Sequence, residues 1–308
     1  MNITFFPSVA RGEIVPPPSK SELLRVLLAA GLADGRSDIT LPRAVPLCDD
    51  AAALVCALRM GGISITETGD GLCVDGAAWR PAGMTDVGES AFLLRTLLPI
   101  AAACGRPLTA IPHGRLSERP DGVLRDFLEN HGVLYRNDGE TVTVRGRLSG
   151  GTYTVRGDVS SQFLSGLLYA LPLCDTDSCI KTVGRTVSRP YIDMTKRTLT
   201  GFGIEIHEHD GEFLIPGRQT YRTPGRVTVP CDPSAAVFPA VLNLIGGRVR
   251  IRGLSDKNTG DAVFLSYFSD PSRLRDGTAV FDLTDTPDLA PALFAAAALV
   301  GGATLKGT

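Results

Sequence analysis

The fold of this chain is decided by the stretch PPPSKSELLR, residues 16–25. Three prolines cannot continue a helix or a central strand, so the chain enters extended and stiff. A long apolar helix then begins at Ser19 or Ser21 and runs to Gly35. Its first backbone N–H groups lie at the positive end of the helix dipole, and Lys20 and Arg25 add charge there. Taken alone, this stretch is most simply interpreted as a capped helix with solvated cations. Because helix starts of this kind recur along the chain, we predict that they form a site for an anion, above all phosphate.

The same design recurs along the chain. Each copy begins with a small or polar residue, continues as an almost wholly apolar helix and ends at Gly or Cys. The copies span residues 21–35, 90–105, 160–174, 234–246 and 288–301. A helix that is apolar on every side must be buried on every side. We therefore expect all five to be core helices.

Helices with one polar face separate these core helices. They are expected at residues 49–60, 121–130, 191–200 and 261–268. The first three end near Gly and continue into strands at 63–67, 133–136 and 204–208. Hairpin turn signals follow at 69–71, 137–139 and 210–211. The predicted fold is therefore α/β (α+β), built from repeated βαβαββ units around buried helices.

The repeats also predict the domains. Three complete units are expected to close one domain over residues 16–228. A fourth, shorter unit begins near Val229, and a fifth begins at Phe281 and reaches one strand beyond its helix by Thr308. We therefore expect residues 229–308 to be part of a second domain, and the chain to be a fragment. Residues 1–15, with strands at 3–6 and 13–15, are predicted to belong to that second domain.

Composition excludes several classes of protein. The 308 residues are 44% hydrophobic and carry a net charge of −2 without a basic block. This indicates a globular protein that binds neither nucleic acid nor a membrane. No apolar run reaches the length of a membrane span and no signal peptide is present, so we predict a cytoplasmic location. The seven cysteines show no metal-ligand spacing, and we expect all of them to be reduced core residues.

Polar residues at the helix starts are predicted to converge, because the repeated units point their buried helices the same way. The buried helices contribute Lys20, Ser21, Arg25, Glu89, Ser90, Arg95, Ser160, Ser161 and Gln162. The amphipathic helices add Ser117-Glu118-Arg119-Pro120 and Ser188-Arg189-Pro190-Tyr191. Capping does not require Arg beside the cap, so five such starts predict a site for more than one anionic group.

Asp288 opens the fifth buried helix and is a carboxylate among the Lys and Arg side chains of the other helix starts. Its simplest interpretation is a helix cap. It is also our candidate for the base that takes the proton of a bound hydroxyl group.

At these residues the chain resembles the 5-enolpyruvylshikimate-3-phosphate (EPSP) synthase family. The likeness covers the whole chain and rests on PSKS at 18–21 with Arg25, RP at 119–120, SSQFL at 160–164, SRPYID at 188–193 and TPD at 286–288. It implies two domains, each of three βαβαββ units. It also implies transfer of the enolpyruvyl group of phosphoenolpyruvate to the 5-hydroxyl of shikimate 3-phosphate, with release of phosphate. No metal or cofactor and a monomeric full-length protein are further implications.

The resemblance also implies roles for individual residues. Shikimate 3-phosphate would be bound by Lys20, Ser21, Arg25, Ser160, Ser161, Gln162, Ser188 and Asp288. Phosphoenolpyruvate would be bound by Lys20, Arg95, Arg119 and Gln162, with Tyr191 lining the same pocket. Asp288 and Lys20 would be catalytic, with Asp288 taking the proton of the 5-hydroxyl. The reaction would proceed by addition and elimination through a tetrahedral ketal.

Two departures from the family pattern have consequences. Glu89 stands where the family commonly has Asn, and Ala91 where it commonly has Gly. The Ala91 methyl would narrow the phosphoenolpyruvate pocket and make the enzyme poorly sensitive to glyphosate. The family's Lys-Glu-Ser-Asp-Arg stretch and its later His-Arg and Lys would lie beyond Thr308. We therefore expect this chain alone to be inactive and to bind shikimate 3-phosphate weakly.

Two other functions are alternatives. A UDP-N-acetylglucosamine enolpyruvyl transferase would share the repeat and the phosphoenolpyruvate chemistry. It is expected to have Lys-Asn where this chain has Lys20-Ser21, and a reactive Cys between Asp86 and Arg95, where this chain has none. A non-catalytic anion-binding module is the second alternative.

Overall fold

The structure is a computed structural model that describes residues 4, 6, 8–76, 79, 83–254 and 260–307. The chain divides into two compact units. The large unit is Lys20–Val229, and the small unit combines Met1–Ser19 with Pro230–Thr308. No helix in the described ranges has the length and apolarity that crossing a membrane requires.

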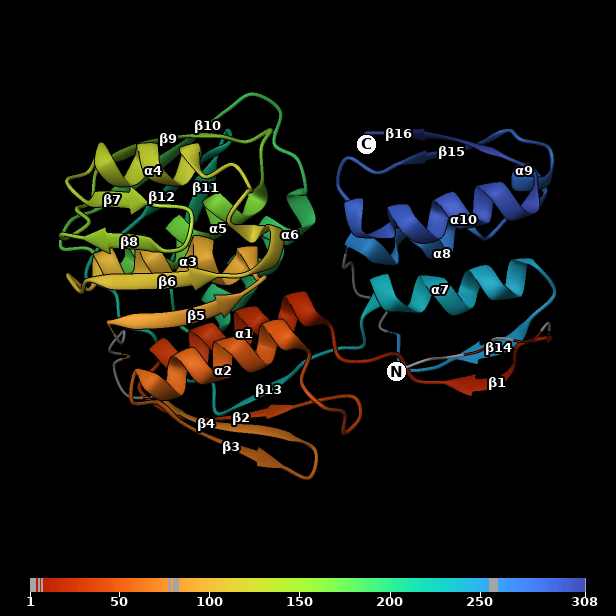
Figure 1. The fold of residues 1–308 in the computed structure, drawn as a ribbon, viewed down its shortest axis with the longest axis horizontal. Helices are drawn as coiled ribbons and strands as arrows, with labels where there is room; N and C mark the ends of the chain where they lie inside the picture. Colours follow the sequence, from red (N-terminus) through yellow and green to blue (C-terminus); the bar gives the residue numbers. More distant parts are fainter. Residues whose placement is uncertain are drawn as a thin grey trace. The chain divides into compact units, whose positions relative to one another are not determined.

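The large unit contains three copies of one module (Figure 1). Each copy has one apolar helix, these being α1 (Lys20–Leu32), α3 (Ala91–Ala103) and α5 (Ser161–Ala170). Each also has one amphipathic helix, these being α2 (Asp49–Met60), α4 (Gly122–Glu129) and α6 (Arg189–Gly201). Short 3-10 turns follow β6 and α5, at η1 (Gly114–Leu116) and η2 (Leu171–Leu173). The helices agree with the predicted ones to within a few residues.

Each module has a four-stranded sheet, and the three sheets share one strand order. The first is β13 (Arg226–Thr228), β2 (Gly35–Thr40), β4 (Gly71–Gly76) and β3 (Ser64–Thr68). The second is β5 (Met84–Gly88), β6 (Leu108–Pro112), β8 (Val142–Arg145) and β7 (Leu134–Asn137). The third is β9 (Thr152–Arg156), β10 (Ser178–Val183), β12 (Glu212–Ile215) and β11 (His207–His209). In every sheet the first pair is parallel and the other pairs are antiparallel.

Two details differ from the predicted strands. The leading strand of the first sheet is β13, so the last segment of the large unit completes its first module. Strand β11 begins at His207 instead of residue 204, because the Gln219 side chain bonds both the backbone N–H and the carbonyl of Glu205. Those groups are therefore not available to a ladder.

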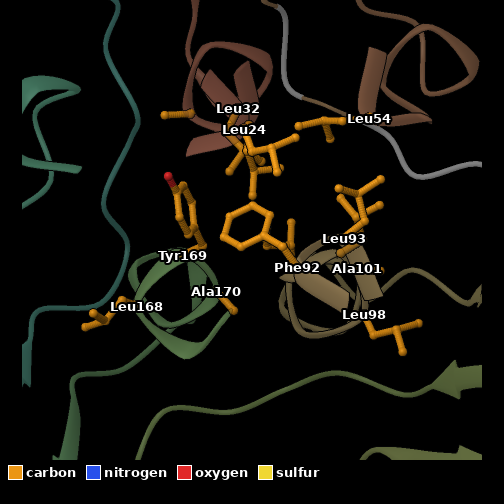
Figure 2. Close-up of a cluster of buried hydrophobic side chains, with 14 of the residues drawn as sticks. Leu24, Leu32, Leu54, Phe92, Leu93, Leu98, Ala101, Leu168, Tyr169 and Ala170 are labelled. Carbon is orange, nitrogen blue, oxygen red and sulfur yellow. The ribbon is translucent and has the colours of Figure 1, made fainter. Parts of the chain in front are cut away.

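The apolar helices of the large unit form its core. Figure 2 shows Phe92 of α3 at the centre of the cluster, between Leu24 of α1 and Tyr169 of α5. Helices α3 and α5 approach closely at Gly166, where an added Cβ would lie 2.1 Å from the Arg95 carbonyl oxygen. The prediction of buried helices is confirmed for α1, α3 and α5.

The small unit has two parallel strand pairs. Strand β1 (Arg11–Ile14) pairs with β14 (Arg248–Ile251), and β15 (Ala279–Asp282) pairs with β16 (Ala303–Lys306). Its helices are α7 (Pro233–Leu244), α8 (Phe264–Tyr267), α9 (Ser272–Arg275) and α10 (Ala290–Val300), with 3-10 turns η3 (Gly260–Val263) and η4 (Pro287–Leu289). The helix expected at 261–268 is thus split between η3 and α8, and α9 was not predicted. Of the strand expected at residues 3–6, Thr4 and Phe6 are described and neither is in a strand, whereas residues 3 and 5 lie outside the described residues.

Helices α7 and α10 are not buried on every side, so this part of the prediction is wrong. Phe238, Phe294 and Leu299 each expose about half of their surface or more. The described strands of the small unit form only the two pairs above. They cannot surround both helices, although α7 and α10 pack against each other.

The cysteines also differ from their prediction. All seven are free thiols, as expected. Cys174 and Cys231 are buried, but Cys48 and Cys56 are exposed. Cys48 is the N-cap residue of α2, and Cys56 lies on that helix toward solvent, because an amphipathic helix buries only one face.

Candidate anion-binding site

Arg95 connects two of the apolar helices. It lies in the second turn of α3, and its Nη1 donates to Gln162 Oε1 at 2.8 Å and to Ser160 Oγ at 3.3 Å. Both partners belong to the start of α5. The guanidinium carbon lies 4.3 Å from the centroid of the Phe163 ring, which supports it from one side. The starts of the second and third modules therefore meet at Arg95.

A second guanidinium acts on the first. Burial, and then the positive charge of Arg119, lower the pKa of Arg95 to about 10. Arg119 follows η1 in the second module and is exposed. Within the described ranges, no carboxylate lies within ion-pair distance of Arg95 or Arg119. Two close cations without an acidic partner favour binding of an anion, which would supply the opposite charge.

The starts of α5 and α6 come together in the third module. Ser160 caps α5, its Oγ accepting from the Gln162 N–H at 3.3 Å, and Ser161 is buried beside it. The N–H of Val187, which precedes Ser188, donates to the carbonyl of Gly157 at 3.0 Å. Ser188, at the start of α6, is thereby held near the loop that leads into α5. Two helix N-termini with three serine hydroxyls form a setting that suits phosphate oxygens.

Ser90 stands at the start of α3 without capping it through its side chain. It is the N-cap residue of α3, but its side chain makes no capping hydrogen bond. The Oγ atom is buried and has no partner among the residues the structure describes. A buried hydroxyl without a partner at a helix start is costly, and a bound ligand or water would relieve it.

Arg25 lies deeper than the sequence suggested. Only 2% of it is exposed, and burial lowers its pKa. Its Nε donates to Thr195 Oγ1 at 2.8 Å and its Nη1 to the Ser21 carbonyl at 2.8 Å. The guanidinium carbon lies 5.0 Å from the Phe92 ring centroid and 5.9 Å from that of Tyr191. Arg25 therefore joins α1, α3 and α6 at the same end of the large unit.

The family of the chain follows from comparison with known proteins. The family model described as EPSP synthase (3-phosphoshikimate 1-carboxyvinyltransferase) matches residues 7–270. This chain belongs to the EPSP synthase family. The predicted resemblance is therefore confirmed.

Curated relatives of this EPSP synthase family chain are named 3-phosphoshikimate 1-carboxyvinyltransferase. One from Clostridium kluyveri is 32% identical over 326 residues, an alignment that covers 98% of this chain and 74% of the relative. One from Yersinia pseudotuberculosis is 35% identical over 271 residues, covering 83% of this chain and 62% of the relative. The chain thus spans part of the length of each.

A solved structure supports the fold. The EPSP synthase from Acinetobacter baumannii superposes with a TM-score of 0.70 at 23% identity, covering 84% of this chain and 59% of that one. The predicted α/β class with an enolpyruvyl transferase fold is confirmed.

The structure brings many predicted EPSP synthase site residues together in the large unit. Arg25 contacts Tyr191, Arg95 contacts Ser160 and Gln162, and Arg119 acts on Arg95. Lys20 opens α1, and its Nζ lies 3.3 Å from Asp50 Oδ2 at the start of α2. Asp288 lies in η4 of the small unit, with its side chain exposed.

Some contacts of the predicted site residues in this EPSP synthase family chain do not follow from the sequence, and one predicted contact is wrong. Thr195 and Phe92 contact Arg25, and Asp50 pairs with Lys20. The sequence does not predict these contacts, because Thr, Phe and Asp are common inside helices whether or not they contact such a residue. Arg189 was predicted to point toward an anion. Its Nε donates to Asp193 and its Nη1 lies 2.6 Å from Glu208 Oε1, so these carboxylates hold its guanidinium instead.

The described residues contain no group of three or more His, Cys, Asp or Glu side chains that could hold a metal. The described donors at the site are hydroxyls, an amide, guanidiniums and an ammonium group. Guanidinium and ammonium groups only donate hydrogen bonds and so bind anionic oxygens, and the hydroxyl and amide groups can donate to the same oxygens.

Proposed function

We propose that this protein transfers the enolpyruvyl group of phosphoenolpyruvate to the 5-hydroxyl of shikimate 3-phosphate, releasing phosphate. The family and the names of its relatives support this activity. The observation that carries the proposal is the pair Arg95 and Arg119, without an acidic partner among the described residues and bonded through Arg95 to Ser160 and Gln162. Both substrates are anions with a phosphate and a carboxylate.

We assign the phosphate of shikimate 3-phosphate to Ser160, Ser161 and Ser188. Helix N-termini bind phosphate through free N–H groups and the helix dipole, and hydroxyl groups complete the shell. The Ser160 hydroxyl accepts from the Gln162 N–H, so its own proton is available to a phosphate oxygen unless another acceptor takes it.

The ring and carboxylate of shikimate 3-phosphate are assigned to Lys20, Ser21, Arg25 and Tyr191. Because Nε and Nη1 of Arg25 already donate inside the protein, the Nη2 edge is the one proposed for the ligand. The buried hydrogen bonds fix the plane of the guanidinium before the ligand arrives.

Phosphoenolpyruvate is assigned to Arg95, Arg119, Lys20 and Gln162. Its negative charges would attract both guanidiniums and so offset the repulsion between them. The same cations would stabilise charge that develops during the reaction. Ala91, buried at the first turn of α3, is proposed to narrow this pocket against glyphosate.

For the chemistry, we assign Asp288 as the base. The 5-hydroxyl oxygen bonds to C2 of phosphoenolpyruvate as Asp288 takes its proton and C3 gains one, which gives a tetrahedral ketal. C3 then loses a proton as the C2–O bond to phosphate breaks, which releases phosphate and restores the double bond. Lys20 is proposed to stabilise the charge on the phosphoenolpyruvate oxygens.

The proposal extends to organisation. We assign the large unit as the shikimate-3-phosphate-binding domain and the small unit as part of a second domain. A cytoplasmic location and a monomeric full-length protein complete the proposal.

Isothermal titration calorimetry tests the proposed ligand. The chain should bind shikimate 3-phosphate and not UDP-N-acetylglucosamine. Arg95→Gln should weaken binding of phosphoenolpyruvate to the shikimate 3-phosphate complex by tenfold or more, as expected for loss of a charge-assisted contact of about 1.5–3 kcal/mol. Arg145→Gln, an exposed guanidinium on β8, is the control and should change nothing.

A phosphate-release assay with both substrates separates an enzyme from a binding module. It is run on the chain alone and with the segment that its longer relatives carry beyond this match. Release that requires both substrates supports the proposal. Binding without release under both conditions would favour a non-catalytic anion-binding protein.

A further inference from the structure

Ser188 has an unusual backbone at a helix start. Its φ of 55° and ψ of 38° lie in the left-handed region, which is unfavourable for residues with a Cβ. The other described non-glycine residues at positive φ are Asp210, in a hairpin turn, and Arg218, in a loop. Ser188 instead opens a thirteen-residue helix. Its side chain makes no capping hydrogen bond in the described structure, so the helix start is not held by the serine itself.

The next residue is held firmly from another element. Arg189 presents two nitrogens to Glu208 on β11, with Nη1 2.6 Å from Oε1 and Nη2 2.7 Å from Oε2. Its Nε donates to Asp193 Oδ1, one turn along α6, at 3.0 Å. This paired arrangement fixes both the position and the plane of the guanidinium. The first residue of α6 is therefore tied to a strand that follows the helix in sequence.

Glu208 is largely buried and stays charged. Its side chain is 18% exposed, and Lys196 also contacts it. The Phe213 ring from β12 lies 6.0 Å from the Arg189 guanidinium carbon and 5.9 Å from Lys196 Nζ. Burial acts to raise the pKa of Glu208, but hydrogen bonds from Arg189 and Lys196 outweigh it, and the net pKa is lowered. A shielded pair of this kind constrains geometry more than a solvated surface pair does.

The geometry points to Glu208 as a positioning residue for ligand binding. By holding Arg189, it keeps Ser188 in the left-handed conformation, with the serine hydroxyl and the first N–H groups of α6 set for the phosphate. This inference rests on the proposed function for the identity of the ligand. Without Glu208, Ser188 is free to relax to an ordinary conformation, and the N–H of Tyr191, which donates to the Ser188 carbonyl at 3.1 Å, loses that partner.

The test compares two carboxylate-to-amide variants of the full chain. Glu208→Gln removes the paired acceptor and keeps the side-chain shape. Glu212→Gln is the control, because Glu212 lies on the adjacent strand β12 and makes an exposed ion pair with Lys181 at 3.0 Å. Calorimetry measures shikimate 3-phosphate binding, and hydrogen exchange measures protection of the Tyr191 amide without ligand. Circular dichroism checks that both variants fold.

We expect Glu208→Gln to weaken binding by about tenfold, as is found for residues that orient metal ligands. Exchange at Tyr191 should become faster, and the control should match the unmodified chain in both measurements. The sign of the effect is decisive, because removing a negative charge near an anion site would by itself tighten binding. Unchanged or tighter binding in Glu208→Gln would overturn the inference and leave the proposed function intact.

If the unmodified chain binds no shikimate 3-phosphate, the proposed function fails instead. The exchange rate at Tyr191 then decides alone whether Glu208 holds the start of α6. Exchange equal to that of the unmodified chain overturns this as well.

Discussion

Replacement of Gly166 by Ala should separate the two helices that carry the Arg95 contacts. The new Cβ would lie 2.1 Å from the Arg95 carbonyl oxygen and 3.2 Å from its carbonyl carbon. Both are backbone atoms, so no side chain can turn away. Since real Cβ atoms essentially never approach closer than 3.0 Å, α3 and α5 must move apart by about 1 Å.

The expected net loss of stability is about 2 kcal/mol. Overpacking of a tight core costs about 1–3 kcal/mol and occasionally more. Helix propensity opposes it, because Ala is favoured over Gly by about 1 kcal/mol inside a helix. A clash between two backbones lies at or above the upper end of the first range, which leaves roughly 2 kcal/mol of destabilisation.

Two other helical glycines give a graded comparison. At Gly201 an added Cβ meets nothing within 4 Å, so Gly201→Ala should stabilise the protein by up to about 1 kcal/mol. At Gly31 the nearest atom is 2.7 Å away, but it is the flexible end of the Leu58 side chain. Gly31→Ala should therefore lie between the other two variants.

Urea unfolding followed by tryptophan fluorescence measures the series. The chain has one tryptophan, Trp79, which is buried in the core of the large unit and reports on its unfolding. Calorimetry with shikimate 3-phosphate should show weaker binding for Gly166→Ala only, since α3 and α5 carry Arg95 and Ser160. A Gly166→Ala variant as stable as the unmodified chain would refute the close approach of α3 and α5.

Three further predictions concern pH, thiols and the small unit. The pKa of Glu208 is lowered in the folded protein, so its contribution to stability is present above its unfolded pKa of about 4.5 and is lost as pH falls through the folded value. Between about pH 6 and pH 3, the urea midpoint of Glu208→Gln should therefore fall less than the urea midpoint of the unmodified chain. An equal fall in the two proteins would contradict this. Cys56 is exposed, whereas burial raises the pKa of Cys174 to about 12. Maleimide should therefore label Cys56 in the native protein and Cys174 only in urea, as detected by peptide mass spectrometry. Labelling of Cys174 in the native protein would refute its burial. Phe294 and Leu299 are exposed on α10, so changing both to Gln should reduce the binding of an apolar dye and the self-association measured by sedimentation. If neither is reduced, these side chains are covered in solution.

Burial patterns explain where prediction of the helices succeeded. Apolar periodicity located α1, α3 and α5, because local sequence determines both helix formation and the demand for burial. The same pattern in α7 and α10 predicted complete burial, and the structure leaves one face of each exposed. The apolar residues of a helix show which of its faces would be buried favourably. Whether those faces are buried depends on how many helices and strands the surrounding fold places against them.

The sequence by itself determined the repeated module, its hairpins and the polar residues at each helix start, because these depend on period, turn residues and capping chemistry close along the chain. Only the tertiary structure decided that β13 completes the first sheet, that Arg25 is held inside by Thr195 and that Glu208 takes the guanidinium of Arg189. These contacts join residues far apart in sequence, and a charged side chain binds whichever partner the fold brings within reach.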